Sequence, residues 1–234
     1  MIKDYTKIQE EIKKDIIEKD SNSIVDGIIN TDKYAKAHTR ILWVLKEPNS
    51  SDIGWTYQSY LSIEDIEKKI GTKENTVSYE LFRRMFYISY GLLSEMDYDN
   101  LPVAEKLEVY GVGEEIAYIN IKKTGGEGES KDSEIKQAYQ ENEALLLKQI
   151  AVYNPNIIIF GGTLKFFDYE KLKEIGWDLK ERKIVDENTN NTHYYPISKE
   201  KLVIYPYHPS YFIKTRAVYC SEIINAGKFW RELF

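Results

Sequence analysis

The sequence predicts an α/β fold with three layers, in which helices cover both faces of a central, mostly parallel sheet of four strands. Four short apolar runs are rich in β-branched and aromatic residues and do not alternate with polar residues, which is typical of strands buried on both faces. Amphipathic helical patterns separate the runs, and such alternation favours a parallel sheet. The predicted strands cover residues 41–45, 116–121, 157–160 and 202–205.

Apolar residues at three- and four-residue steps predict the helices. The clearest covers residues 133–153, with Asp132 or Ser133 as its N-cap and Asn154-Pro155 as its stop. A further short helix begins near Ser62, where the sequence resembles a capping box. We expect the segment 178–197 to form a small hairpin. The other predicted helices cover residues 7–19, 78–94 and 217–233.

Length and composition limit the classes of protein. The 234 residues predict one domain, residues 1–234, whose first 35 residues form a helical extension. The single cysteine, Cys220, excludes an internal disulfide and a multi-cysteine zinc or iron–sulfur site within one chain, so we expect no cofactor and no metal. A net charge of −6 argues against a general coat of positive charge, but it is compatible with a local basic groove.

The chain shows no signal peptide and no apolar run long enough to cross a bilayer. We therefore expect a cytoplasmic protein with no membrane partner, and we expect a monomer.

Polar residues and glycines follow all four predicted strands. Glu47 follows the first, Asn120 lies at the end of the second, Gly161-Gly162 follows the third, and His208-Pro209-Ser210 follows the fourth. Ligands bind beyond the carboxyl ends of parallel strands, so these residues form a candidate site. Each also has a simpler interpretation: a solvated loop charge, an asparagine bonded to backbone, a tight turn, and a serine that caps a helical turn.

In this order and spacing the motifs resemble those of the uracil-DNA glycosylase superfamily, over roughly residues 40–211. The matching segments are Leu45-Lys46-Glu47-Pro48, the strand that ends at Asn120, the run from Asn154-Pro155 to Gly162, and His208-Pro209-Ser210. The chain differs from the family pattern because Leu45 replaces a leading glycine, Glu47 stands where several branches have Asp or Asn, and Tyr211 stands where many members have proline. It also lacks the cysteines that hold an iron–sulfur cluster in one branch.

The resemblance implies a hydrolase of DNA repair that excises uracil or a related base from DNA. A glycosylase flips one base out of the stack and stabilises the charge that develops on it. Asn120 would read the uracil edge, His208 would donate to the uracil O2, and Glu47 would orient water or balance charge on the sugar. Pro48 and Asn49 belong to the same substrate-binding motif.

The resemblance also implies an aromatic platform for the base and donors for DNA phosphates. Tyr57 or Tyr60 follows the first motif at the spacing of the family's stacking aromatic, although packing of the loop explains both equally well. The DNA partner is either single- or double-stranded. The candidate DNA-binding residues are Ser50, Ser51, Lys122, Lys123, Ser210 and Tyr211.

Two alternatives stay open. One is a catalytically altered protein of the same fold that binds nucleic acid or nucleotides without excising uracil, which the acidic charge and Glu47 favour. The other, a serine hydrolase that uses Ser210 and His208, is less favoured because the two are only two residues apart and no Gly-x-Ser-x-Gly elbow is present.

Overall fold

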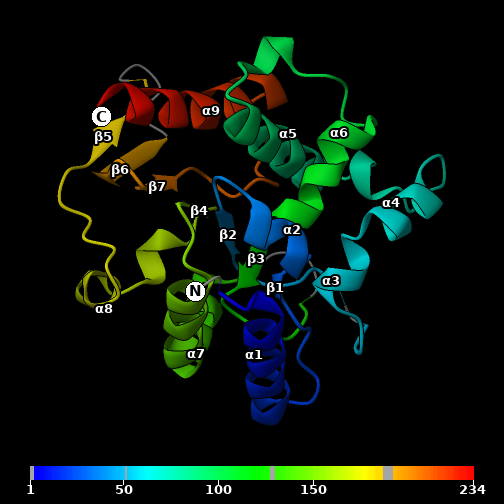
Figure 1. Ribbon diagram of the computed structural model, residues 1–234. Helices are drawn as coiled ribbons and strands as arrows, with labels where there is room; N and C mark the ends of the chain where they lie inside the picture. The colour runs from blue at the N-terminus through cyan, green and yellow to red at the C-terminus, as the bar shows by residue number, and fades with distance from the viewer. Residues whose placement is uncertain (1–2, 51, 127–129, 187–191) are drawn as a thin grey trace.

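A computed structural model describes residues 3–50, 52–126, 130–186 and 192–234. Seven strands form one mixed sheet in the order β1-β3-β2-β4-β7-β6-β5, with helices on both sides (Figure 1). The strands are β1 (Gly27–Ile28), β2 (Ile41–Leu45), β3 (Ala117–Asn120), β4 (Ile157–Phe160), β5 (Lys183–Ile184), β6 (His193–Ser198) and β7 (Lys201–Tyr205). The helices are α1 (Tyr5–Lys19), α2 (Thr31–Lys36), α3 (Tyr57–Tyr60), α4 (Ile63–Lys69), α5 (Glu80–Ser94), α6 (Leu107–Tyr110), α7 (Asp132–Tyr153), α8 (Tyr169–Glu174) and α9 (Arg216–Glu232).

The prediction of an α/β fold is confirmed, and the four predicted strands are the central part of the sheet. β3, β2, β4 and β7 are neighbours in that order, and each adjacent pair is parallel. The predicted sheet was too small, because β1 adds an antiparallel edge beside β3 and β6 adds one beside β7. The predicted hairpin is confirmed as the antiparallel pair β5 and β6, which continues the sheet.

Two apolar clusters pack against opposite faces of the sheet. Ile41, Trp43 and Leu45 of β2 belong to a cluster that includes residues of α5 and α9, whereas Leu42 and Val44 belong to one with residues of α1 and α7. Figure 1 shows α5 and α9 on one side of the sheet and α1 and α7 on the other. All five residues of β2 are buried, which explains why its sequence has no polar alternation.

The capping residues predicted from the sequence are found at some helix ends but not at others. Ser62 caps α4 as predicted, since its side chain accepts a hydrogen bond from the Asp65 backbone N–H. The predicted N-cap of α7, Asp132 or Ser133, is wrong, because Lys131 is the N-cap residue and provides no side-chain hydrogen bond. Asn154 ends α7 in the left-handed conformation, with φ +48°, as asparagine often does.

The N-terminal segment, predicted as a helical extension, contributes to the sheet as well as to the helices. Ile12 and Ile16 of α1 are buried in the cluster that contains α7. Gln9 Oε1 accepts a hydrogen bond of 2.9 Å from the Ile28 N–H, which joins α1 to β1. Gly27 has φ +125°, and a Cβ there would collide with the Tyr153 hydroxyl and the Gln9 amide.

Over these described ranges, every helix is too short or too polar to cross a membrane. Cys220, on α9, is fully buried, and burial raises the pKa of its thiol.

Candidate functional site

Backbone contacts bring the four predicted strand ends to one edge of the sheet. Asn120 pairs in register with Leu45, and Leu45 precedes Glu47 by two residues. The Gly161 N–H donates to the Val44 carbonyl (3.1 Å), and the Gly162 N–H donates to the Pro206 carbonyl (2.9 Å). A Cβ on Gly161 would lie 3.0 Å from Pro209 Cδ, so the last motif packs directly on the third. The glycines are therefore explained by close packing in addition to any role with a ligand.

His208 is held in one tautomer by Ser210. The Ser210 backbone N–H donates to Nδ1 (3.3 Å), and the Ser210 hydroxyl lies 2.7 Å from the same atom. Since Nδ1 accepts from the backbone, the proton of a neutral ring is on Nε2. Burial, and secondarily the charge of Lys46, lowers the pKa of His208 to about 4. His208 is therefore a neutral imidazole near pH 7, with Nε2 as a donor.

Asn120 has a buried side chain that forms no hydrogen bond of good geometry within the described chain, although the phenols of Tyr57 and Tyr118 lie close enough to interact with it. It is 0% exposed, and both Oδ1 and Nδ2 lack a hydrogen-bond partner there. Leaving such groups unpaired costs about 1–3 kcal/mol each. The amide lies near the phenols of Tyr57 and Tyr118, whose pKa values burial raises and the amide partly lowers. Its backbone N–H, in contrast, donates to Asp26 Oδ2 (2.8 Å).

Glu47 is engaged by its own neighbours. Its carboxylate accepts a hydrogen bond of 2.7 Å from Lys122 Nζ and another from the Ser130 hydroxyl, and the side chain is only 9% exposed. A Cβ on Gly126 would lie 2.5–2.6 Å from the carboxylate atoms. Glu47, Asn120 and His208 therefore start from one sheet edge, but among described residues no hydrogen bond joins any two of them.

The other predicted substrate-binding residues differ in exposure. Tyr57 is buried and stacks on Tyr118, with ring centroids 4.3 Å apart and an interplanar angle of 27°. Tyr60 is half-buried and packs against Trp55 and Phe82, so it lies in the core of the α3 segment. Pro48 is buried and Asn49 is exposed. In both tyrosines, the packing interpretation accounts for the contacts seen.

Lys123 is a correction to the predicted DNA-binding residues. Its side chain is 4% exposed, and Nζ lies 2.8 Å and 3.0 Å from the two carboxylate oxygens of Asp26. It also donates to Gln149 Oε1 (2.8 Å), which completes a buried polar network. Burial lowers the pKa of Lys123, and Asp26 opposes that effect. A buried, paired ammonium group is unavailable to a phosphate in this structure.

The remaining predicted DNA-binding residues lie at or near the edge. Ser50 Oγ accepts from the Asp52 N–H (3.0 Å) and the Trp55 indole N–H (3.3 Å), which shapes the first loop. Ser210 is bonded to His208, and Tyr211 is half exposed. Lys122 is tied to Glu47. Ser51 lies outside the described residues.

Two residues of this region carry no motif and were not predicted from the sequence. Asp26 precedes β1 and joins Asn120 and Lys123, which are 94 and 97 residues away. Arg84, on α5, is buried and reaches the loop after His208. Neither has a local sequence signal, because their partners are distant in the chain.

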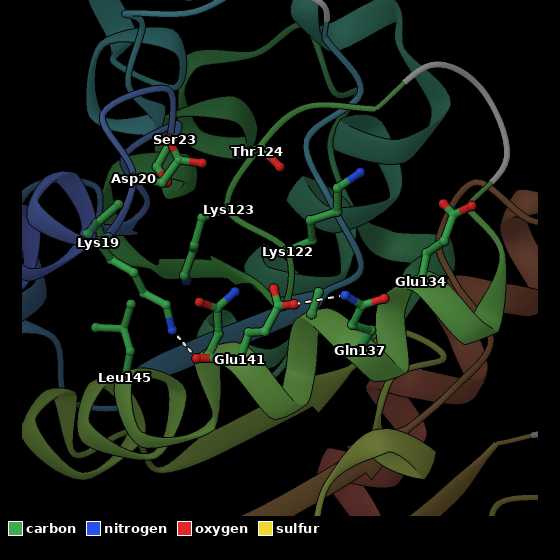
Figure 2. Close-up of a pocket in the computed structure, with 13 residues that line it drawn as sticks. Lys19, Asp20, Ser23, Lys122, Lys123, Thr124, Glu134, Gln137, Glu141 and Leu145 are labelled. Atoms are coloured by element: carbon green, nitrogen blue, oxygen red, sulfur yellow. Dashed lines mark hydrogen bonds between the residues drawn. The ribbon is translucent and has the colours of Figure 1, made fainter.

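A cavity of about 440 Å³ lies beside this edge, between α1, α7 and the residues that follow β3. Figure 2 shows Glu134, Gln137 and Glu141 along α7, with Lys19 reaching across from α1 to the Glu141 carbonyl. Lys122 and Lys123 also line the cavity, but Glu47, Asn120 and His208 do not. The charged residues that line it are mixed in sign, with three lysines and the three acidic residues Asp20, Glu134 and Glu141.

Across the described residues, no cluster of His, Cys, Asp or Glu side chains is suited to hold a metal ion. No protein-family model matches the chain, and no curated protein matches it either.

Proposed function

We propose that the chain is a glycosylase-like protein that hydrolyses the N-glycosidic bond of uracil or a related damaged base in DNA. The fold supports this proposal, because four parallel strands with helices on both faces agree with the three-layer uracil-DNA glycosylase arrangement that the motifs imply. The ends of those strands carry Glu47, Asn120 and His208 at one edge. Fold alone does not determine function, so the proposal depends on the side chains.

The observation that carries the proposal is the unpartnered amide of Asn120. A buried donor and acceptor that remain unpaired are costly unless they serve a ligand. One amide oxygen and one amide N–H match the donor and acceptor at the N3 and O4 edge of uracil. The amide is shut off from solvent in this structure, so a base reaches it only if the residues that cover it move.

His208 supplies the second function of such a site. Its Nε2–H would donate to the base O2, where negative charge develops as the glycosidic bond breaks. The low pKa keeps the imidazole neutral between about pH 5 and 8. Activity is therefore expected to stay nearly constant as the pH falls through the ordinary titration range of histidine.

Glu47 would orient the attacking water or balance positive charge on the sugar. Its carboxylate already accepts from Lys122 and Ser130. These contacts hold the carboxylate in one direction, which suits an electrostatic role better than proton abstraction.

The test is an assay for base release from oligonucleotides that contain uracil or other lesions, in single and double strands. Abasic sites would be detected by alkaline cleavage and the free base by mass. We expect Asn120→Ala and His208→Ala each to lower the rate by 100-fold or more, on the order of one lost transition-state contact. The exposed residues Asn22 and His38 provide matched controls, Asn22→Ala and His38→Ala, which should leave it unchanged. Release that survives Asn120→Ala combined with His208→Ala would refute the assigned roles.

A second candidate is a protein of this fold that binds nucleic acid or nucleotides without excision. The engagement of Glu47 by Lys122 and the sealed position of Asn120 favour it. Binding of uracil-containing DNA without release of any base across the lesion panel would select this alternative.

A further inference from the structure

Arg84 is a buried residue that joins the body of the protein to the loop carrying His208. This loop connects β7 to α9. From α5, Arg84 Nη1 donates to the carbonyls of Pro209 (3.1 Å) and Tyr211 (2.8 Å), and Nη2 donates to the carbonyl of Lys214 (3.0 Å). One guanidinium group therefore binds three backbone carbonyls within six residues of the loop.

The surroundings of Arg84 fix the guanidinium group itself. Its Nε donates to Glu80 Oε1 (2.8 Å), which provides the counter-charge that a buried cation needs. Arg216 binds the same carboxylate at 2.6 Å. The Tyr219 ring lies 4.9 Å from the guanidinium carbon, and the Arg84 side chain is only 3% exposed. The donors are thus held in a rigid plane.

The section of the loop that follows Ser210 does not bury its apolar side chains. Phe212 is 80% exposed, Ile213 is 67% exposed, and Tyr211 is 49% exposed. Burial of these residues therefore contributes little to holding the loop in one conformation. Hydrogen bonds from the interior must supply that order, and the three from Arg84 span the exposed section.

We propose that Arg84 is a positioning residue, which fixes the loop so that His208 stays packed at the sheet edge, hydrogen-bonded to Ser210, while the apolar tip of residues 211–213 remains exposed. The consequence for base excision rests on the proposed function, but the positioning itself does not. A lysine cannot replace Arg84, because a single ammonium group lacks the planar set of donors that spans three carbonyls.

The experiment is an NMR titration of His208 in the full chain, with assignment by His208→Gln. In the wild type the pKa of His208 should lie near 4, because packing removes much of the ring from water and Lys46 is its charged neighbour. In Arg84→Lys and Arg84→Ala we expect a rise of about one unit or more toward the ordinary value, since a loosened loop admits water to the ring. Added guanidinium ion, well below denaturing concentrations, should partly reverse the change in Arg84→Ala.

Arg83→Met is the matched control. Arg83 neighbours Arg84 on α5 but pairs with Glu105, so its loss should leave the His208 titration unchanged. His193, whose pKa burial lowers, should titrate as in the wild type in every variant, which excludes a general loss of structure. In the unsubstituted protein, the Arg84 guanidinium protons should give separate, slowly exchanging signals, and this measurement applies even if a variant fails to fold.

An unchanged His208 titration in both Arg84 variants would overturn the proposal, as would freely rotating Arg84 guanidinium protons in the wild type. If the protein releases bases, the Arg84 variants should lower kcat about tenfold or more with little change in KM. If it releases none, the proposed function fails, while the titration still decides the role of Arg84.

Discussion

At the scale of single residues, we predict that the buried amide of Asn120 lowers the stability of the fold and is needed for ligand binding. Replacing Asn120 with leucine removes two unpaired polar groups and keeps most of the volume. We expect the free energy of unfolding to stay the same or rise by about 1 kcal/mol, while binding of any base is lost. Denaturant unfolding monitored by circular dichroism measures the change.

Asn142→Leu provides the matched comparison. Asn142 is also buried, but its Nδ2 donates to the Ile121 carbonyl (2.9 Å), so its removal leaves that carbonyl without its partner. We expect a loss of about 1–3 kcal/mol there. If Asn120→Leu destabilises the protein as much as Asn142→Leu, the amide of Asn120 has a structural partner after all.

The positions of some residues can be predicted from local sequence, whereas those of others cannot. The positions of Asn120 and His208 at strand ends follow from local patterns, because a parallel sheet places those ends together. The burial of Lys123 does not, since the pair Lys122-Lys123 has the sequence appearance of a solvated basic strip. Only the partner Asp26, which is 97 residues away, makes the interior position acceptable to an ammonium group.

At the scale of elements, the attachment of β1 to α1 depends on the absence of a side chain at Gly27. Alanine there would require a disfavoured φ of +125° and would collide with Tyr153 and Gln9. We expect Gly27→Ala to lower the free energy of unfolding by about 2–5 kcal/mol, as left-handed strain and overpacking add. The shift in denaturant midpoint, at constant m-value, measures it.

Gly71→Ala separates the two causes. Gly71 has φ +83° but nothing within 4 Å of an added Cβ, so only the strain of about 1–2 kcal/mol applies. Equal losses in the two variants would mean that β1 moves away from α1 without cost.

The elements also explain which parts of the fold the sequence predicts. The central strands are continuous apolar runs of four or five residues, and the long helices repeat their pattern over several turns, so local sequence identifies both. β1 has two residues, one of them a glycine, and no period can be read from so short a segment. β1 forms because its Ile28 N–H donates to Gln9 and because it pairs with β3. Both are tertiary contacts, which a local sequence pattern does not reveal.

At the scale of the whole molecule, a net charge of −6 and the pairing of the nearby cations predict weak dependence of DNA binding on salt. Lys122 pairs with Glu47, Lys123 with Asp26, Lys214 with Glu222, and Arg216 with Glu80. With about two phosphates neutralised, affinity for single-stranded DNA should fall by less than about tenfold between about 50 and 200 mM salt. Fluorescence anisotropy across that range measures the slope.

Glu47→Gln tests the origin of that slope. It removes the charge that pairs with Lys122, so the slope should steepen by about 0.7, the value of one additional phosphate contact. A steep slope in the wild type, equivalent to six or more phosphates, would contradict the prediction and show that the ion pairs open when DNA binds.

The two ends of the sheet have a consequence for association between copies of the chain. Its outermost strands, β1 and β5, are only two residues long. A short outer strand offers few free backbone groups to a strand from another molecule, so the sheet is poorly suited to grow by intermolecular pairing. The strongly apolar strands β2 and β4, which would be prone to amyloid-like stacking if they were outermost, are each flanked by partners on both sides. The order of the strands therefore protects the folded molecule against aggregation, and detachment of β1 and β5 alone would expose β3 and β6 while β2 and β4 stay flanked.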